Sequence, residues 1–373
     1  MCSRNVGDDI ARDRDRMTVE PPDPTAVSSH EIDTALLAGF GFVCRPDCGL
    51  CCFTSPRLDS LDEQRLRAVA PDARVVRQNG ERCVAARPDG GACQFLRSLR
   101  CQVHSARPAP CREFPLSVHI GTRLQATVVF SCPGLSLSPL PSYGEARDSR
   151  PSSGLESELD SARSRVTPAV ERRRQEAERR RRKIVRTLED EGRWVDEDEV
   201  RAQLRGRRLL PGREKYLPSQ LPDVGEGLEK FPMYFDGRAG PVVLAEAEAG
   251  WEALELSPLG GSTSLGLASP PDLLPTLEAD AEKLLEGFLR YWLDRDCFLA
   301  AVHLDMLSVR EGNVEEVALE ELHAIASDAM ARAAVRVQLN GRSGARLGAS
   351  DIELGIRATD QDWLDRPTWG SRL

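Results

Sequence analysis

The chain has 373 residues, of which 40% are hydrophobic and 29% are charged, and this composition excludes a collagen-like or wholly disordered protein. At roughly 100 to 200 residues per domain, the length predicts two domains with connecting segments. The net charge of −9 argues against a protein that coats nucleic acid along its whole length.

Targeting signals are missing from the expected places. The longest apolar stretch, residues 297–309, is interrupted by a histidine and an aspartate and is shorter than the roughly 18 to 20 residues that cross a bilayer. The first residues, MCSRNVGDDIARDRDR, are charged where a signal peptide needs an apolar segment. The sequence therefore predicts a cytoplasmic protein with reduced thiols, and a disordered N-terminal arm over residues 1–33.

Cysteine is concentrated in one part of the chain. Nine of the 11 cysteines fall between Cys44 and Cys132, and their number is odd. In a reducing compartment, such a concentration favours metal binding over disulfide bonds.

The first cysteine group has the order C-x3-C-x2-C-C. Pro46 and Gly49 interrupt any regular helix here, so the segment is expected to form a loop that directs several sulfurs inward. Neighbouring residues of an extended chain point to opposite sides. The vicinal pair is therefore expected to serve two metals, or two corners of one larger site. The group consists of Cys44, Cys48, Cys51 and Cys52.

The second group contains Cys93, Cys101 and Cys111, and Cys132 follows in the segment SCPG. The order C-x3-C-x2-C-C, then C-x-F-L, C-x-V-H-x-x-R-P-x-x-C-R-x-F-P and C-P-G, resembles the YkgJ-type cysteine-cluster family. That family is described as a zinc- or iron-chelating domain, and the resemblance covers about residues 40–135. Cys83 lies outside the shared motif.

The resemblance implies a metal-binding set of eight cysteines. Zinc and iron-sulfur clusters both take four thiolates from such loops, so the spacing leaves the metal open. We expect an iron-sulfur cluster, with zinc as the alternative, because vicinal cysteines and flanking arginines suit a multi-iron cluster better than two zinc sites. The implied ligands are Cys44, Cys48, Cys51, Cys52, Cys93, Cys101, Cys111 and Cys132.

Other residues near the motif are less strongly indicated as metal ligands. Cys83 is interpreted as a strand residue, and His104 as a packing or hydrogen-bonding residue more than a ligand. Arg107 and Arg112 either donate hydrogen bonds to sulfur, which tunes a reduction potential, or lie on the surface as arginines fixed by neighbouring prolines. The residues leave these two interpretations open.

The pattern along the chain predicts an α+β fold, with a small loop-rich cysteine module followed by a mainly helical region. Ser60 and Glu63 predict a capped helix, and strands are expected at residues 75–76, 83–84 and 122–130. The expected domains are an arm at 1–33, a metal-binding domain at 34–135, a linker at 136–160, a helical domain at 161–340 and a weakly structured tail at 341–373.

A basic helix is expected over residues 167–191, starting at Thr167 and Pro168. Between Arg163 and Arg186 the chain carries 11 basic and 3 acidic residues, a local balance of 11 − 3 = +8. The helix segment Arg172–Lys183 is a candidate for nucleic-acid binding. We favour a solvated helix with Glu–Arg pairs, because no aromatic residues are interleaved for stacking on bases.

The remaining segments predict secondary structure but few residues with a chemical role. A strand is expected at residues 241–248, a loop at 260–271, a helix from Leu274 onward and a second helix over Val314–Val337. The glycines of the 260–271 segment match no phosphate-binding pattern.

The leading functional hypothesis is a metal-binding protein, most consistent with an iron-sulfur protein that has a redox role and an unknown protein or redox partner. One alternative is an enzyme, because LLEGFLRYWLDRDCF is loosely similar to a helix of flagellin lysine N-methylases, which would imply S-adenosylmethionine as the donor. Another alternative is a zinc-folded interaction module. The residues identify no reaction.

Overall fold

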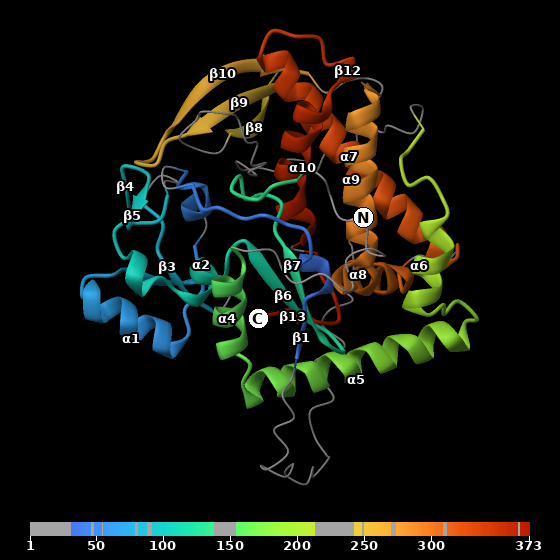
Figure 1. Cartoon of the computed structure of the whole chain (residues 1–373), viewed down its shortest axis with the longest axis horizontal. Coiled ribbons are helices and arrows are strands. Elements are labelled where there is room, and N and C mark those ends of the chain that lie inside the picture. The colour runs from blue at the N-terminus through green and yellow to red at the C-terminus, as the bar shows by residue number, and fades with distance from the viewer. Residues whose placement is uncertain are drawn as a thin grey trace, which may run out of the picture. The chain divides into compact units, whose positions relative to one another are not determined.

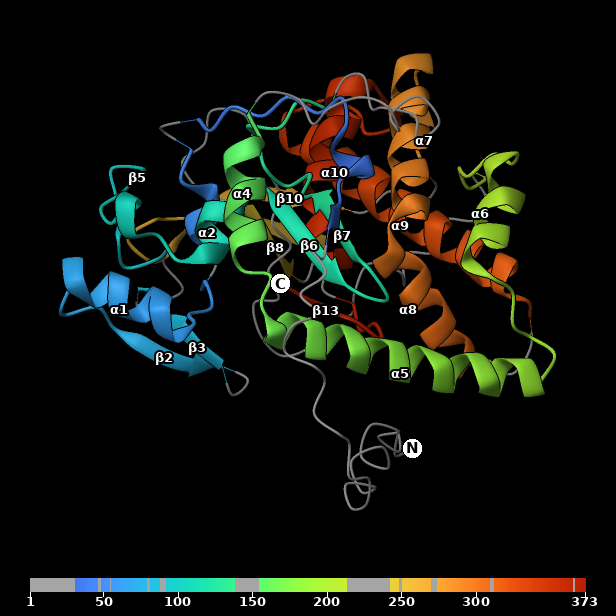
Figure 2. The same cartoon turned by 60° about the horizontal axis from the view of Figure 1, so that its bottom comes forward.

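Small sheets and helices alternate along the chain, which confirms the α+β fold class (Figures 1 and 2). The computed structural model describes residues 31–45, 48–53, 55–78, 81–87, 92–137, 154–212, 242–247, 250–269, 274–308, 312–364 and 366–373. Most of the arm expected at 1–33 and of the linker expected at 136–160 lies outside these residues. No helix of the described residues is long and apolar enough to cross a membrane.

The cysteine-bearing part consists of short elements. Asp59, not Ser60, is the N-cap of the first helix, because its carboxylate accepts a hydrogen bond from the backbone N–H of Asp62. The elements are β1 (Ile32–Asp33), α1 (Ser60–Val69), β2 (Val75–Gln78), β3 (Glu81–Val84), β4 (Leu96–Arg97), β5 (Arg100–Cys101), α2 (Ala109–Glu113), β6 (Leu116–Ile120) and β7 (Leu124–Val128).

The largest sheet of the described residues joins both ends of the chain in the order β1-β7-β6-β13. The β6–β7 hairpin is antiparallel, with Leu116 opposite Val128, and β7 confirms the strand expected at 122–130. β1 adds to it in parallel, and β13 (Ser371–Arg372) pairs with β6. The last residues of the chain therefore complete a sheet that begins before the first motif cysteine.

Helices dominate after residue 154. The expected start at Thr167 and Pro168 and the expected helix over Val314–Val337 are confirmed, whereas the long helix from Leu274 is two helices that meet at the buried Arg295. The helices are α4 (Glu156–Ser164), α5 (Pro168–Asp190), α6 (Glu197–Arg205), α7 (Ala279–Asp294), α8 (Asp296–Met306), α9 (Val314–Leu339) and α10 (Ala349–Leu364).

A second sheet has the order β10-β9-β8, and a two-stranded parallel pair joins β11 (Thr276–Leu277) to β12 (Arg346–Leu347). The loop expected at 260–271 is wrong, because β10 (Ser262–Ala268) pairs with β9 (Gly250–Leu256). Most of its side chains are exposed, so the strand shows no apolar alternation in the sequence. The strand expected at 241–248 is confirmed as β8 (Val242–Ala247).

The segment 341–373 was expected to be weakly structured, and it instead contains α10. Ile352 and Ile356 are buried, but so are Asp351, Arg357 and Asp360 on the same helix. These buried polar residues interrupt the apolar period, and this is why the sequence pattern is weak.

One hydrophobic core extends from β1 to the C-terminal residues, and contacts group Ile32–Leu373 as one unit. Phe130 makes edge-on ring contacts with Phe40, Phe288 and Tyr291, at centroid distances of 5.6, 5.2 and 4.9 Å. Residues on both sides of the expected linker thus pack together. A separate small core lies in the cysteine-bearing part and consists of Leu58, Leu66, Ala73, Val84 and Val103.

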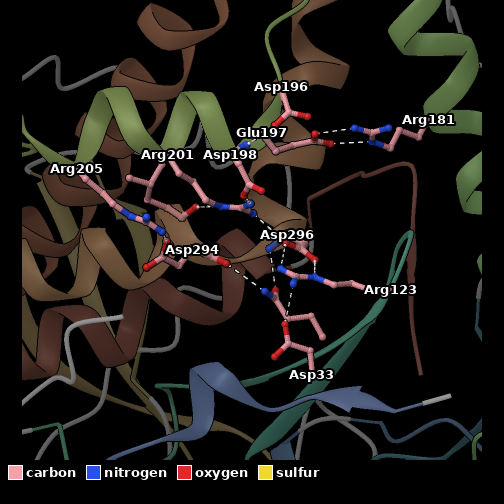
Figure 3. Close-up of polar contacts among 12 residues, drawn as sticks. Asp33, Arg123, Arg181, Asp196, Glu197, Asp198, Arg201, Arg205, Asp294 and Asp296 are labelled. Atoms are coloured by element: carbon pink, nitrogen blue, oxygen red, sulfur yellow. Dashed lines mark hydrogen bonds and ion pairs between the residues drawn. The ribbon is translucent and has the colours of Figure 1, made fainter. Parts of the chain in front are cut away.

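Asp296, at the start of α8, links the sheet to the helices (Figure 3). Its carboxylate accepts hydrogen bonds from Arg123 at 2.6 Å and from Arg201 of α6 at 2.8 Å. Arg123 lies in the β6–β7 turn and also pairs with Asp33 of β1 at 2.9 Å. These ion pairs connect β1, the β6–β7 hairpin, α6 and α8.

Candidate metal centre

The two cysteine groups meet through their backbones. Cys51 and Cys52 lie in a short 3-10 turn, Leu50–Phe53, which follows Gly49 with its positive φ of 62°. A side chain at Gly49 would also press against Leu96. The backbone N–H of Cys93 donates a 2.6 Å hydrogen bond to the carbonyl of Cys52, which joins the first group to the second.

Electrostatic coupling indicates that all eight cysteines of the motif lie near one another. A negative charge on Cys51 raises the pKa of each of the other seven thiols, and such coupling requires proximity because Coulomb interactions weaken with distance. The pKa of Cys297 is instead raised by burial and by the nearby carboxylates of Asp296 and Asp360. The seven thiols are those of Cys44, Cys48, Cys52, Cys93, Cys101, Cys111 and Cys132.

The vicinal pair is asymmetric. The Cys52 thiol hydrogen-bonds to the Cys51 sulfur, and this bond, more than the nearby charge of Arg107, lowers the pKa of Cys51 to about 7. The same bond and burial raise the pKa of Cys52. Cys51 is therefore the thiol of the group that is most readily deprotonated near neutral pH.

The other thiols of the group are stabilised in their protonated form. Burial is the main cause that raises the pKa of Cys93, Cys101 and Cys111, and it raises the pKa of Cys132 to about 12. A metal binds thiolates, so loading this site has to release protons.

The donor set suits zinc or iron, since all ten cysteines of the described residues are thiols with no disulfide bond among them. Within the described part of the chain, no three Cys, His, Asp or Glu side chains are close enough to share one ion. The eight sulfurs therefore share a neighbourhood without forming one coordination sphere, and the ligand assignment stays a prediction.

The structure separates the two arginines of the motif. The Arg107 guanidinium lowers the pKa of Cys44, Cys51, Cys101 and Cys111, and its buried Nε has no hydrogen-bond partner among the described residues. This placement favours the interpretation in which Arg107 acts on the sulfurs.

Arg112 faces a different set of atoms. It contacts the Asp62 carboxylate at 3.4 Å, the Ser161 hydroxyl at 3.4 Å and the carbonyl of Arg107. Its role is to hold α2 against α1 and α4.

Asp62 is a supporting residue that the sequence pattern missed. It is buried in the first turn of α1, and its Oδ2 accepts a 2.9 Å hydrogen bond from the backbone N–H of Ala109, the first residue of α2. The α2 helix carries Cys111, so Asp62 positions that thiol. The only signal in the sequence is the acidic first turn of α1, which is typical of any helix.

Cys83 and His104, the two other residues considered near the motif, lie in different surroundings. Cys83 is buried in β3 opposite Val76, which confirms it as a strand residue. His104 is exposed, and the positive charge of Arg107 is the main cause that lowers its pKa. The packing role expected for His104 is wrong because the residue is exposed, whereas the hydrogen-bonding role stays a prediction.

Residues 43–132 match the family model CxxCxxCC, whose description is "Putative zinc- or iron-chelating domain". Searches of curated proteins and of solved structures found no match to the chain. The match covers all eight cysteines of the expected set and ends at Cys132. The chain thus carries a metal-binding domain of the zinc- or iron-chelating type.

Proposed function

We propose that the CxxCxxCC domain at residues 43–132 binds its metal through the eight coupled cysteines as an iron-sulfur centre with a redox role. The observation that carries this proposal is the coupling of Cys51 to the seven other thiols of the motif. The seven thiols and Cys51 are the same eight cysteines that the motif contains, and the causes that shift the pKa of Cys297 include no motif cysteine.

Two features support iron-sulfur over zinc. Cys51 and Cys52 are adjacent and their side chains are hydrogen-bonded, so a cluster with more than one iron can take both sulfurs. Arg107 adds a guanidinium whose Nε has no hydrogen-bond partner in the described part of the chain. A bound cluster would supply one-electron transfer, and hydrogen bonds to its sulfurs from Arg107 would raise the reduction potential.

Anaerobic purification of the full chain tests the proposal, with iron, zinc and acid-labile sulfide measured per chain. We expect iron and sulfide in similar amounts and a visible absorption band that bleaches on reduction. A colourless protein with two zinc ions and no sulfide would contradict the iron-sulfur assignment while leaving metal binding intact.

A zinc-folded interaction module is the second candidate, and a specific observation favours it. Among the described residues, the small core beside α1 has five buried side chains, so a structural metal would add much of the folding free energy. These are Leu58, Leu66, Ala73, Val84 and Val103. Val43, Leu61 and Val69 are also exposed in this part of the chain, at 75%, 51% and 54%. Exposed apolar residues are typical of docking surfaces.

Chelation distinguishes this candidate. If the module is folded by zinc, a chelator should increase hydrogen exchange in α1, β2 and β3 while leaving α9 and α10 protected. Unchanged exchange in α1 after complete zinc removal would exclude a folding role.

A further inference from the structure

The orientation of α5 is fixed by its apolar side. Val170, Ala177, Ile184 and Leu188 are buried along the helix. The helix runs below β6 and beside α8 in both views (Figures 1 and 2). The opposite side of α5 therefore faces solvent along its whole length.

Pairs between Glu and Arg neutralise part of the positive charge of α5, as expected for a solvated helix. Arg174 pairs with Glu171 at 2.9 Å and Arg180 with Glu176 at 2.5 Å. Arg181 extends toward α6, where Glu197 accepts its hydrogen bonds at 2.6 and 2.8 Å (Figure 3). Glu178, the remaining acid of the central stretch, lies 4.0 Å from Arg182.

Four cations on the solvent side are left over. Arg172, Arg179, Lys183 and Arg186 are exposed, and none of them pairs with an acid in the described part of the chain. Their spacings of seven, four and three residues place them in one line along the helix. At 1.5 Å per residue, the line from Arg172 to Arg186 is about 21 Å long. We call these four residues the outer stripe.

The outer stripe borders a shallow hollow. This hollow has a volume of about 370 Å³, and Arg179, Lys183 and Arg186 of the stripe line it together with Arg182, Thr187 and Asp190. The lining is dominated by positive charge.

The chemistry of the outer stripe selects one class of partner. None of the exposed large hydrophobic residues among the described residues lies on α5, so the stripe lacks the apolar anchors that dominate protein–protein interfaces. It also lacks aromatic residues, which single-stranded nucleic acids use for stacking. A straight row of unpaired cations instead complements the regular phosphates of a duplex.

We propose that the outer stripe binds the phosphate backbone of double-stranded nucleic acid, without reading its sequence. Since the opposite side of α5 is packed in the core, the helix lies across the backbone and does not enter a groove. The chain has a net charge of −9, so the contact is confined to this face. The stripe lies outside residues 43–132, so this proposal and the metal assignment fail independently.

The test is fluorescence anisotropy of a labelled DNA duplex with the full chain between 50 and 200 mM salt. Four phosphate contacts give a slope of about −3.6 for log K against log salt, so the affinity should fall about 100-fold over this range. The variant R179Q/K183Q/R186Q keeps one stripe cation, and its slope should be about −0.9. Its affinity at 50 mM salt should be at least about tenfold lower.

A charge-matched control separates the stripe from overall charge. R67Q/R208Q/R346Q removes three arginines that are 45%, 68% and 72% exposed on other elements, and it should keep the wild-type slope. Equal binding by the two triple variants, or no binding at 50 mM salt, would overturn the proposal. Competition by poly-glutamate as effective as that by unlabelled duplex would also overturn it, in favour of an acidic protein partner.

Discussion

The guanidinium of Arg357 holds the backbone around Cys132. It donates hydrogen bonds to the carbonyls of Phe130 at 3.0 Å and Leu135 at 2.8 Å, and to the carbonyl of Cys132 itself. Arg357 belongs to α10, more than 200 residues after Cys132 along the chain. The position of the last motif cysteine thus depends on the C-terminal helix.

Replacing Arg357 should therefore weaken both stability and metal retention. R357M removes the donor of the Phe130 and Leu135 carbonyls, whereas the Cys132 carbonyl keeps the backbone N–H of Leu135, and each unsatisfied group costs about 1–3 kcal/mol. We expect the free energy of unfolding in urea to fall by at least about 2 kcal/mol and the metal content per chain to fall with it. R346Q, at a 72% exposed side chain, should change stability by less than about 0.5 kcal/mol. Wild-type stability in R357M would show that the hydrogen bonds from Arg357 to these carbonyls are dispensable.

The motif cysteines and the other cysteines should respond differently to substitution. C51A removes the thiol that is coupled to all seven others, and it should abolish metal binding. C83A and C297A remove thiols that lie outside the motif, and they should keep the wild-type metal content. Metal analysis of the three purified variants checks this, and comparable metal loss in C83A would mean that the ligand set is wrong.

Asp62 should matter for the site although it is not expected to touch metal. D62A removes the acceptor for the backbone N–H of Ala109 and the partner of Arg112. Leaving a buried backbone N–H without its acceptor costs about 1–3 kcal/mol. We expect a lower melting temperature and a faster transfer of metal to a chelator. D72A, in an exposed turn, is the control, and equal transfer rates in the two variants would contradict a positioning role for Asp62.

His119 should make the fold sensitive to mild acid. Burial lowers its pKa to about 4, against an ordinary value near 6.5, and its Nδ1 has no hydrogen-bond partner among the described residues. Asp296 raises this pKa and Arg372 lowers it further, and both effects are smaller than that of burial. Between about pH 6.5 and 4 the unfolded chain binds a proton that the folded chain does not, so stability falls as the pH falls.

The size of this effect can be isolated with a single variant. From pH 7 to pH 5 the His119 contribution should lower the free energy of unfolding by about 2 kcal/mol. H119Q should lack this part of the pH dependence, so urea unfolding of both proteins at pH 7 and pH 5 measures it as a difference. Parallel pH profiles would refute the assignment to His119.

Short-range sequence patterns predicted the helices whose start or apolar period is encoded in neighbouring residues. The N-terminal boundary of α5 follows from Thr167 and Pro168, and α9 follows from a strong helical period. The eight cysteines could be gathered into one set because the motif spacing is specific. In contrast, β10 was missed because its side chains are mostly exposed, and α10 was missed because it buries Arg357 and Asp360.

What the sequence could not provide was long-range support for the site. Asp62 and Arg357 act through backbone groups of residues 47 and 225 positions away, and no local pattern encodes such pairs. The division into domains at 34–135 and 161–340 stays a prediction, although one core spans both. The methylase alternative depends on a loose similarity over residues 284–298, which span the end of α7 and the start of α8, and it also stays a prediction.

X-ray absorption at the metal edge of the loaded full-length protein tests the central claim most directly, because it reports the atoms bound to the metal whichever metal is present. Thiolate binding by the motif cysteines predicts a first shell of sulfur alone for either metal, at about 2.3 Å if the metal is zinc. A first shell dominated by nitrogen or oxygen would contradict the account.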